Sequence, residues 1–296
     1  MEHEHHHHEI SGKYLGLSIL LNIAISVAQL VGGLISGSMA LITDATHNFS
    51  DVLSLVISYI ANRLAKRNAT VKQTFGFKRS EIIAAFVNST TLIIIAFIIL
   101  YNSIVLLFSP HEIKTDWVIY LAIVSIAVNG LSVLFIKKDA KDNLNMKSAY
   151  VHLFSDMLTS IAVLIGGLAM KYFHWYSLDS IFSILIAIYL LYMSYGIFRN
   201  SLKILMQFTP DGINIEEIST IVESIEGVKN IHHIHIWQIN DHEIIFEAHI
   251  DLQQDIKISE FENILNTIDE KLHKYNIHHL NIQPEFSYND VKEKIS

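Results

Sequence analysis

Apolar residues dominate the chain from residue 13 to about residue 207, in long runs separated by short polar stretches. A run of roughly 20 apolar residues is long enough to cross the hydrocarbon core of a bilayer as a helix. The pattern therefore predicts six transmembrane helices, near residues 13–35, 40–63, 80–108, 116–136, 149–171 and 179–201. The predicted fold class is an α-helical membrane protein that lies in a lipid bilayer.

The pattern changes after residue 208, where apolar positions alternate with charged ones over shorter segments. Pro210-Asp211-Gly212 marks a turn, and Asn240-Asp241 marks a hairpin. The periodicity predicts an αββαβ order, with helices at 214–226 and 257–275 and strands at 228–239, 243–252 and 279–286. This order predicts a small α+β domain whose helices cover one face of a sheet.

The chain thus divides into four predicted parts. These are a His-rich tail (1–12), a six-helix transmembrane domain (13–207), a second, polar domain (208–289) and a C-terminal tail (290–296). We interpret the tail of residues 1–12 as native rather than as a purification tag, because it has only four consecutive His and its sequence is interleaved with Glu. Tracts of this composition bind metal loosely.

Lys and Arg gather in the loops on one side of the predicted helices. The loops after the second and fourth helices are basic, whereas the opposite loops hold only Lys114 and Lys171. Because basic loops stay in the cytoplasm, both termini are predicted to be cytoplasmic. We expect a multi-pass protein of the bacterial inner membrane.

Composition narrows the function further. The net charge of −8 conceals an asymmetry, since residues 1–209 carry a net charge of +3 and the remainder carries −11. An acidic soluble part argues against nucleic-acid binding, which needs a basic face, and is expected to attract cations. The absence of cysteine excludes disulfides and thiolate metal sites.

Two identical spacings place ionisable residues inside predicted transmembrane helices: His47-x-x-x-Asp51 and His152-x-x-x-Asp156. Residues four apart share one face of a helix. Ionisable groups at bilayer depth are costly and usually face a partner or a water-filled path. Two imidazoles and two carboxylates can supply four ligands in the tetrahedron that Zn²⁺ favours. We predict that these four residues form one metal site.

Asp44 lies seven residues before Asp51, on roughly the same helical face. Asp44 has two possible roles. It either serves the site, by orienting the ligands or carrying protons, or it caps its helix, and the spacing favours neither role. Asn48, Asn129 and Ser155 are expected to form hydrogen bonds between helices.

A second group of candidate ligands lies in the polar domain. Strand alternation puts His232 on the opposite face from His233, and puts His249 on a polar face. His278 and Glu285 follow near the last strand. These clusters of His and carboxylate predict a regulatory metal site in this domain.

The chain resembles the cation diffusion facilitator family, in its zinc-transporter branch. The resemblance covers nearly the whole chain after the tail. It rests on Gly37-Ser-Met-Ala-Leu, Asp44-Ala-x-His47-x-x-x-Asp51, Phe75-Gly-x-x-Arg79-x-Glu81-x-x-Ala84-Ala85, His152-x-x-x-Asp156, Leu205-Met206, His232-x-x-His235-Ile-Trp237 and Ile282-Gln283-x-Glu285.

The resemblance implies a homodimer with a ferredoxin-like cytoplasmic domain that binds metal and dimerises. It also implies export of a divalent metal from the cytosol, with inward proton flow. The set of two His and two Asp resembles the type that handles Zn²⁺ and Cd²⁺, with Zn²⁺ as substrate and as a possible regulatory ligand. By this resemblance, His232, His249, His278 and Glu285 match positions that bind metal in the cytoplasmic domains of some relatives. No catalytic cofactor is implied.

Two positions depart from the family pattern. Residues 70–77 offer no His or Asp, so the metal site that some relatives have in this loop is expected to be absent. Gln207 stands where many relatives have an acidic residue, so no ion pair with Arg79 is expected.

The residues thus predict metal/proton antiport by alternating access, because a protonated imidazole does not bind metal. A membrane metal sensor or scaffold, which binds metal without moving it, would keep the same ligands. An intramembrane metalloenzyme would need a general base and an open metal position beside a substrate cleft, and neither is apparent from the sequence.

Overall fold

The computed structural model describes residues 12–137, 144–241, 243–287 and 292–294. The predicted His-rich tail lies outside them, apart from Gly12. Tertiary contacts divide the chain into two compact units, Met1–Ile57 with Asn88–Tyr195, and Ser58–Val87 with Gly196–Ser296.

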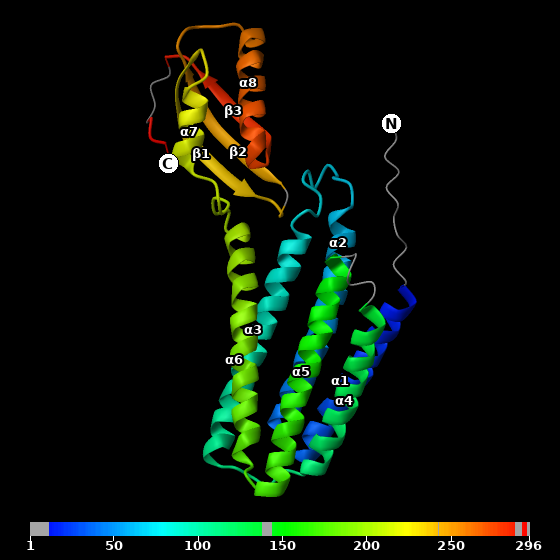
Figure 1. The fold of residues 1–296 in the computed structure, drawn as a ribbon. Helices are drawn as coiled ribbons and strands as arrows, with labels where there is room; N and C mark the ends of the chain where they lie inside the picture. The colour runs from blue at the N-terminus through cyan, green and yellow to red at the C-terminus, as the bar shows by residue number, and fades with distance from the viewer. Residues whose placement is uncertain (1–11, 138–143, 242, 288–291, 295–296) are drawn as a thin grey trace. The chain divides into compact units, whose positions relative to one another are not determined.

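Six long helices form the first two-thirds of the chain, as the apolar pattern predicts (Figure 1). They are α1 (Gly12–Ser36), α2 (Met39–Ala65), α3 (Ser80–Phe108), α4 (Thr115–Ile136), α5 (Leu144–Phe173) and α6 (Ser177–Leu205). In the described residues, four of them, α3 to α6, contain segments long and apolar enough to cross a membrane. α2 does not meet that standard, and it is the helix that contains Asp44 and Asp51.

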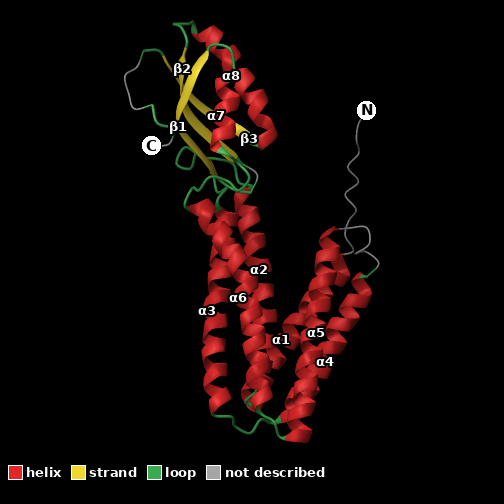
Figure 2. Cartoon of the chain, turned by 60° about the vertical axis from the view of Figure 1, so that its left-hand side comes forward, coloured by secondary structure: helices red, strands yellow, loops and turns green. Residues whose placement is uncertain are grey.

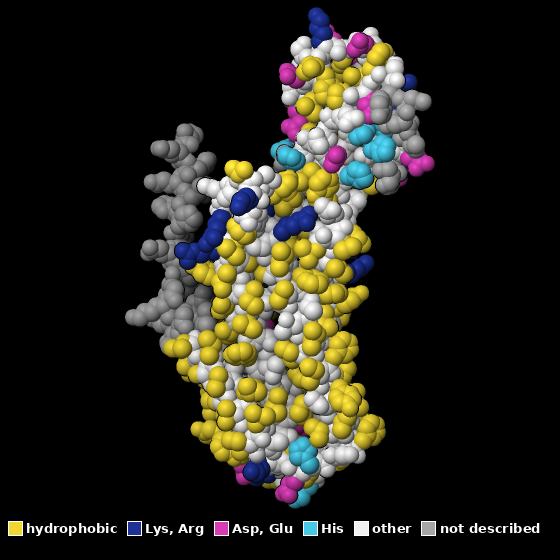
Figure 3. All heavy atoms as spheres, turned by 180° about the vertical axis from the view of Figure 1, so that it is seen from behind, with side chains coloured by type: hydrophobic (Ala, Val, Ile, Leu, Met, Phe, Trp, Pro, Cys, Tyr) yellow, Lys and Arg dark blue, Asp and Glu magenta, His cyan; other side chains and the backbone are white. Residues whose placement is uncertain are grey.

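Large hydrophobic side chains cover the outer surface of these helices, and charged side chains lie near the helix ends (Figure 3). A soluble protein rarely exposes so large a continuous apolar surface. The exposed Leu34, Tyr101 and Tyr192 belong to this surface. The helices therefore present an apolar surface to lipid along their length.

Glycines allow α1 to approach its neighbours closely. A methyl group added at Gly32 would lie 2.0 Å from Leu121 Cδ1 of α4, and one at Gly33 would lie 2.6 Å from Ile42 Cγ1 of α2. The same holds for α5, where a methyl group at Gly166 would lie 2.7 Å from the Phe182 ring. Small residues at these positions thus allow close helix packing, as is common between helices in lipid.

The C-terminal domain has the predicted αββαβ order (Figure 2). Its elements are α7 (Ile215–Glu223), β1 (Val228–Gln238), β2 (Ile244–Leu252), α8 (Ile258–Leu272) with a short 3₁₀ turn η2 (His273–Tyr275), and β3 (Ile277–Glu285). The sheet order is β1-β2-β3, with β1 antiparallel and β3 parallel to β2. α8 provides the crossover that a parallel pair requires.

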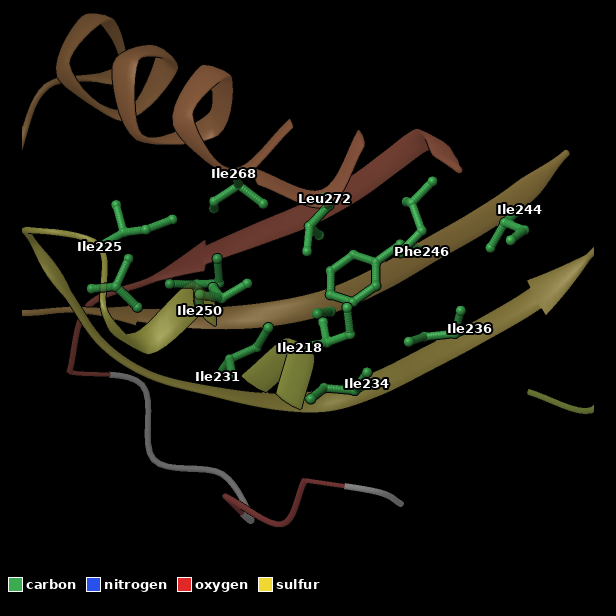
Figure 4. Packing of buried hydrophobic residues seen from close by; sticks show 14 of the residues in the cluster. Ile218, Ile225, Ile231, Ile234, Ile236, Ile244, Phe246, Ile250, Ile268 and Leu272 are labelled. Carbon is green, nitrogen blue, oxygen red and sulfur yellow. The ribbon is translucent and has the colours of Figure 1, made fainter. Parts of the chain in front are cut away.

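One face of this sheet packs against α7 and α8. Ile231, Phe246 and Ile250 from the strands meet Ile218 of α7 and Ile268 of α8 in one buried cluster (Figure 4). Along β2 the even-numbered residues point into this core, so Glu247, His249 and Asp251 point to the other face. The candidate ligand His249 therefore lies on the sheet face opposite the helices.

Candidate functional site

α2 and α5 each present a His and an Asp one helical turn apart. On α2, His47 Nδ1 lies 3.5 Å from Asp51 Oδ2. On α5, His152 Nε2 lies 3.5 Å from Asp156 Oδ2. Both pairs follow directly from the i, i+4 spacing of an uninterrupted helix.

The two pairs also face each other across the helices. His152 Nε2 lies 3.5 Å from Asp51 Oδ2, and His47 Nε2 lies 4.0 Å from Asp156 Oδ1. The two imidazole rings stand nearly perpendicular, with centroids 6.4 Å apart. The structure thus brings the four predicted residues together around one small volume.

Burial of these side chains is uneven. Asp156 is only 2% exposed, whereas His152 is 44% exposed. His47 Nδ1, Asp51 Oδ2 and Asp156 Oδ2 are buried without a hydrogen-bond partner in the part of the chain that is described. Buried polar atoms left without a partner are costly, so atoms that converge in this way suit a bound cation. The partial exposure of His152 leaves one side of the cluster accessible.

The carboxylate of Asp44 on α2 connects three helices. Its Oδ2 accepts a 2.7 Å hydrogen bond from Gln29 Nε2 of α1, and its Oδ1 accepts a 3.3 Å bond from Thr159 Oγ1 of α5. α2 begins at Met39, whose N–H donates to Asp179 Oδ2 of α6. Asp44 lies in the second turn of α2 and is therefore not its cap.

Two polar residues of the helices do not behave as expected. Asn48 and Asn129 are fully buried, and within the described residues their side-chain amides form no hydrogen bond. The expectation of hydrogen bonds between helices is wrong for these two side chains. They leave unsatisfied polar groups in the interior of the helical part of the chain.

In the C-terminal domain, His232, His249 and Glu285 come together from three strands. Their candidate ligand atoms all lie within 4.8 Å of one another. Glu285 Oε2 lies 3.3 Å from His232 Nε2, and Glu285 Oε1 lies 2.9 Å from His249 Nδ1. His232 is completely buried and Glu285 is 3% exposed. The fourth predicted member, His278, has its side chain outside the described residues.

The predicted separation of His232 from His233 is wrong. The pairing of β1 with β2 shifts register between His232 and His235, and His233 has a left-handed φ of 50°. This bulge turns His233 toward the site, so its ring centroid lies 5.5 Å from that of His232 and 5.0 Å from that of His249. Strict alternation fails here because a bulge inserts an extra residue.

Two residues in this cluster were not identified from the sequence. Asp251 is the next site-facing residue on β2 after His249, so alternation could have found it. Lys292 lies in the predicted C-terminal tail, yet its Nζ is 2.8 Å from Glu285 Oε2 and 3.1 Å from Asp251 Oδ1. No local pattern connects Lys292 with the strands.

A bundle of apolar helices around a His and Asp cluster, followed by a small α+β domain, defines an integral membrane protein that handles cations. Comparison with known proteins gives the family. Residues 15–206 match the cation efflux transmembrane domain, and residues 210–287 match the cytoplasmic domain of cation efflux proteins. The chain belongs to the cation efflux family, the cation diffusion facilitators.

Relatives match over nearly the full length of the chain. The "Cadmium, cobalt and zinc/H(+)-K(+) antiporter" of Bacillus subtilis is 35% identical, over 95% of this chain and 91% of its own length. The "Metal cation efflux system protein CzcD" of Cupriavidus metallidurans is 30% identical, over 96% and 90%. The "Zinc transporter ZitB" of Escherichia coli is 28% identical, over 88% and 83%.

Membership of this family makes the chain a multi-pass membrane transporter of the cation efflux type rather than an enzyme. It also places the C-terminal domain in the cytoplasm, as the distribution of Lys and Arg predicts. The following sections therefore call it the cytoplasmic domain.

Proposed function

We propose that the chain exports divalent metal cations from the cytosol, with Zn²⁺ and Cd²⁺ as substrates and protons moving inward in exchange. His47, Asp51, His152 and Asp156 would bind the transported ion. The observation that carries the proposal is the convergence of these four side chains from α2 and α5, with contacts of 3.5–4.0 Å between them.

The chemistry of the four groups supports this substrate class. Imidazole nitrogen and carboxylate oxygen are ligands for Zn²⁺, which prefers four ligands in a tetrahedron. The two carboxylates balance the charge of a divalent ion, so its transfer to the interior of the bundle is not opposed by an uncompensated charge. The antiporter of Bacillus subtilis has cadmium, cobalt and zinc in its name, which agrees with this choice.

Exchange with protons follows from the same ligands. A His side chain must be neutral to bind metal, so binding by His47 and His152 releases any protons that they hold. A more acidic exterior returns protons to the imidazoles and expels the metal. Alternating access then requires the cluster to open to one side of the membrane at a time.

The cytoplasmic domain supports two finer proposals. His232, His249 and Glu285 would bind a regulatory Zn²⁺, because three ligand atoms already lie within 4.8 Å of one another. His278 is proposed as the fourth ligand. The domain would also hold two copies of the chain together in a homodimer.

The test is Zn²⁺ flux into proteoliposomes under an imposed pH gradient. We expect gradient-driven flux in the wild type and none in Asp51→Ala. Asp116→Ala is the matched control, because Asp116 is a carboxylate at the exposed start of α4 that pairs with Lys171. Tight Zn²⁺ binding without flux under any gradient would overturn transport and leave a membrane metal sensor.

A further inference from the structure

Residues 292–294, the C-terminal segment, pair with the edge of β1 that faces away from β2. His233 N donates a 3.1 Å hydrogen bond to Glu293 O, and Ile234 N donates a 2.8 Å bond to Lys294 O. β1 has β2 on its other side, and the bulge at His233 lies at this point of pairing. A short extended segment that pairs with a strand edge is held mainly by such backbone bonds.

This pairing places the ammonium group of Lys292 among the ligands of the proposed cytoplasmic metal site. Lys292 Nζ lies 2.8 Å from Glu285 Oε2, 3.1 Å from Asp251 Oδ1 and 3.3 Å from His232 Nε2. Two of these three atoms, on His232 and Glu285, belong to residues that the proposed metal site uses. One cation already sits where those two side chains converge.

The hydrogen bonds of His232 show which ring nitrogen faces this cation. Its Nδ1 lies 3.0 Å from Asn230 Oδ1, and its Nε2 is the ring nitrogen beside Lys292 Nζ. A partner on the opposite ring nitrogen orients the imidazole of a metal-binding His.

We infer that Lys292 is a tethered cation that competes with metal for the cytoplasmic site, so that metal binding releases the C-terminal segment from β1. The inference rests on the proposed function of His232, His249 and Glu285 as metal ligands. It adds the regulation of that site by the chain's own C-terminal segment.

Charge explains why the exchange can proceed in both directions. Asp251 and Glu285 supply two negative charges, and one ammonium group balances only one of them. A divalent metal balances both. A metal ion and Lys292 cannot share the position, so the metal stabilises only the form from which Lys292 has left. The apparent affinity for metal is lowered in proportion to the time that Lys292 occupies the site.

The first experiment measures Zn²⁺ binding by the full-length chain in an Asp51→Ala and Asp156→Ala background, which weakens the proposed transport site. The Zn²⁺ binding that is lost in His249→Ala is assigned to the cytoplasmic site. We expect Lys292→Met to tighten this binding about tenfold, the factor for a site blocked about nine-tenths of the time. Lys292→Arg keeps the cation and is expected to bind as the parent does.

Lys294→Met is the matched control, because Lys294 lies in the same segment, pairs through its backbone and has an exposed side chain. We expect its affinity for Zn²⁺ to equal that of the parent. Equal or weaker Zn²⁺ binding by Lys292→Met than by Lys294→Met would overturn the inference.

The second experiment follows the segment itself. The chain has no cysteine, so Glu293→Cys creates a single site for a spin label on an exposed side chain. We expect Zn²⁺ to make the label mobile, and Lys292→Met to make it mobile without Zn²⁺. A label that stays immobile while Zn²⁺ binds through His249 would overturn release of the segment. If His249→Ala leaves Zn²⁺ binding unchanged, the cytoplasmic site itself fails, and the inference fails with it.

Discussion

Asp179, in the first turn of α6, accepts a 2.6 Å hydrogen bond from the backbone N–H of Met39, the first residue of α2. The same oxygen lies 3.3 Å from Ala40 N, and the other oxygen accepts a hydrogen bond from Ser38 Oγ. A carboxylate at this position accepts hydrogen bonds from the free N–H groups of the first turn. Its negative charge also interacts favourably with the positive end of the helix dipole. A side chain of α6 thus anchors the helix that holds His47 and Asp51.

We expect Asp179→Ala to destabilise the protein by about 1–3 kcal/mol, because buried donors lose their acceptor. Asp179→Asn keeps one carbonyl oxygen and should have an intermediate effect. Thermal unfolding in detergent measures both. Asp116→Ala removes a carboxylate from an exposed pair with Lys171 and should leave the unfolding temperature nearly unchanged. Equal unfolding temperatures for Asp179→Ala and Asp116→Ala would show that the anchor contributes nothing.

Removal of one proposed transport ligand should weaken metal binding severely. We expect Asp156→Ala to lower Zn²⁺ affinity at this site by about 100-fold or more, since loss of outer partners of a metal ligand alone costs about 10–100-fold. Ser155→Ala changes the neighbouring residue of α5 and is expected to retain binding. Titration of each purified variant with Zn²⁺ makes the comparison. Comparable affinities for the two variants would exclude Asp156 from the site.

The dependence of transport on pH should follow the imidazoles. Protons and metal compete for the same nitrogens, so Zn²⁺ affinity should fall as the pH falls from about 8 to about 6, the range in which His ordinarily titrates. The double variant His47→Asp with His152→Asp should show a flatter profile. Zn²⁺ flux measured over this range decides the point. An unchanged profile in the double variant would mean that the His protons are not the coupled ions.

Two glycines offer a matched test of helix packing. A methyl group at Gly33 would lie 2.6 Å from Ile42 Cγ1 and 3.1 Å from Ile42 N, whereas one at Gly196 has nothing within 4 Å. Gly33→Ala should destabilise the protein by about 1–3 kcal/mol through overpacking. Gly196→Ala should be neutral or stabilise it by up to about 1 kcal/mol through helix propensity. Thermal unfolding of the two variants should move in different directions, and equal shifts would exclude close packing at Gly33.

The features that sequence reasoning identified depend on regular periodicity. The six helices follow from apolar runs, and the convergence of His47 with Asp51 and of His152 with Asp156 follows from the helical repeat. The polar face of β2 follows from alternation in the same way. In each case the relevant neighbours lie within a few residues of one another.

The features that sequence reasoning missed depend on contacts between distant residues. Asp179 caps a helix that begins 140 residues earlier, and Lys292 reaches Asp251 over 41 residues. The bulge at His233 requires a non-glycine residue with positive φ, which periodicity does not anticipate. Only the folded chain brings these groups together.

The arrangement of the four proposed transport ligands, His47, Asp51, His152 and Asp156, has a consequence for ion release. Each helix holds its own His and Asp at a spacing that helical geometry preserves, whereas contacts between α2 and α5 depend on the distance between two rigid bodies. Separation of these helices would divide a four-coordinate site into two chelating halves without any change of rotamer. The ion would lose half its ligands at once, and coordination number, rather than the rearrangement of any one side chain, would distinguish the state that holds the ion from the state that releases it.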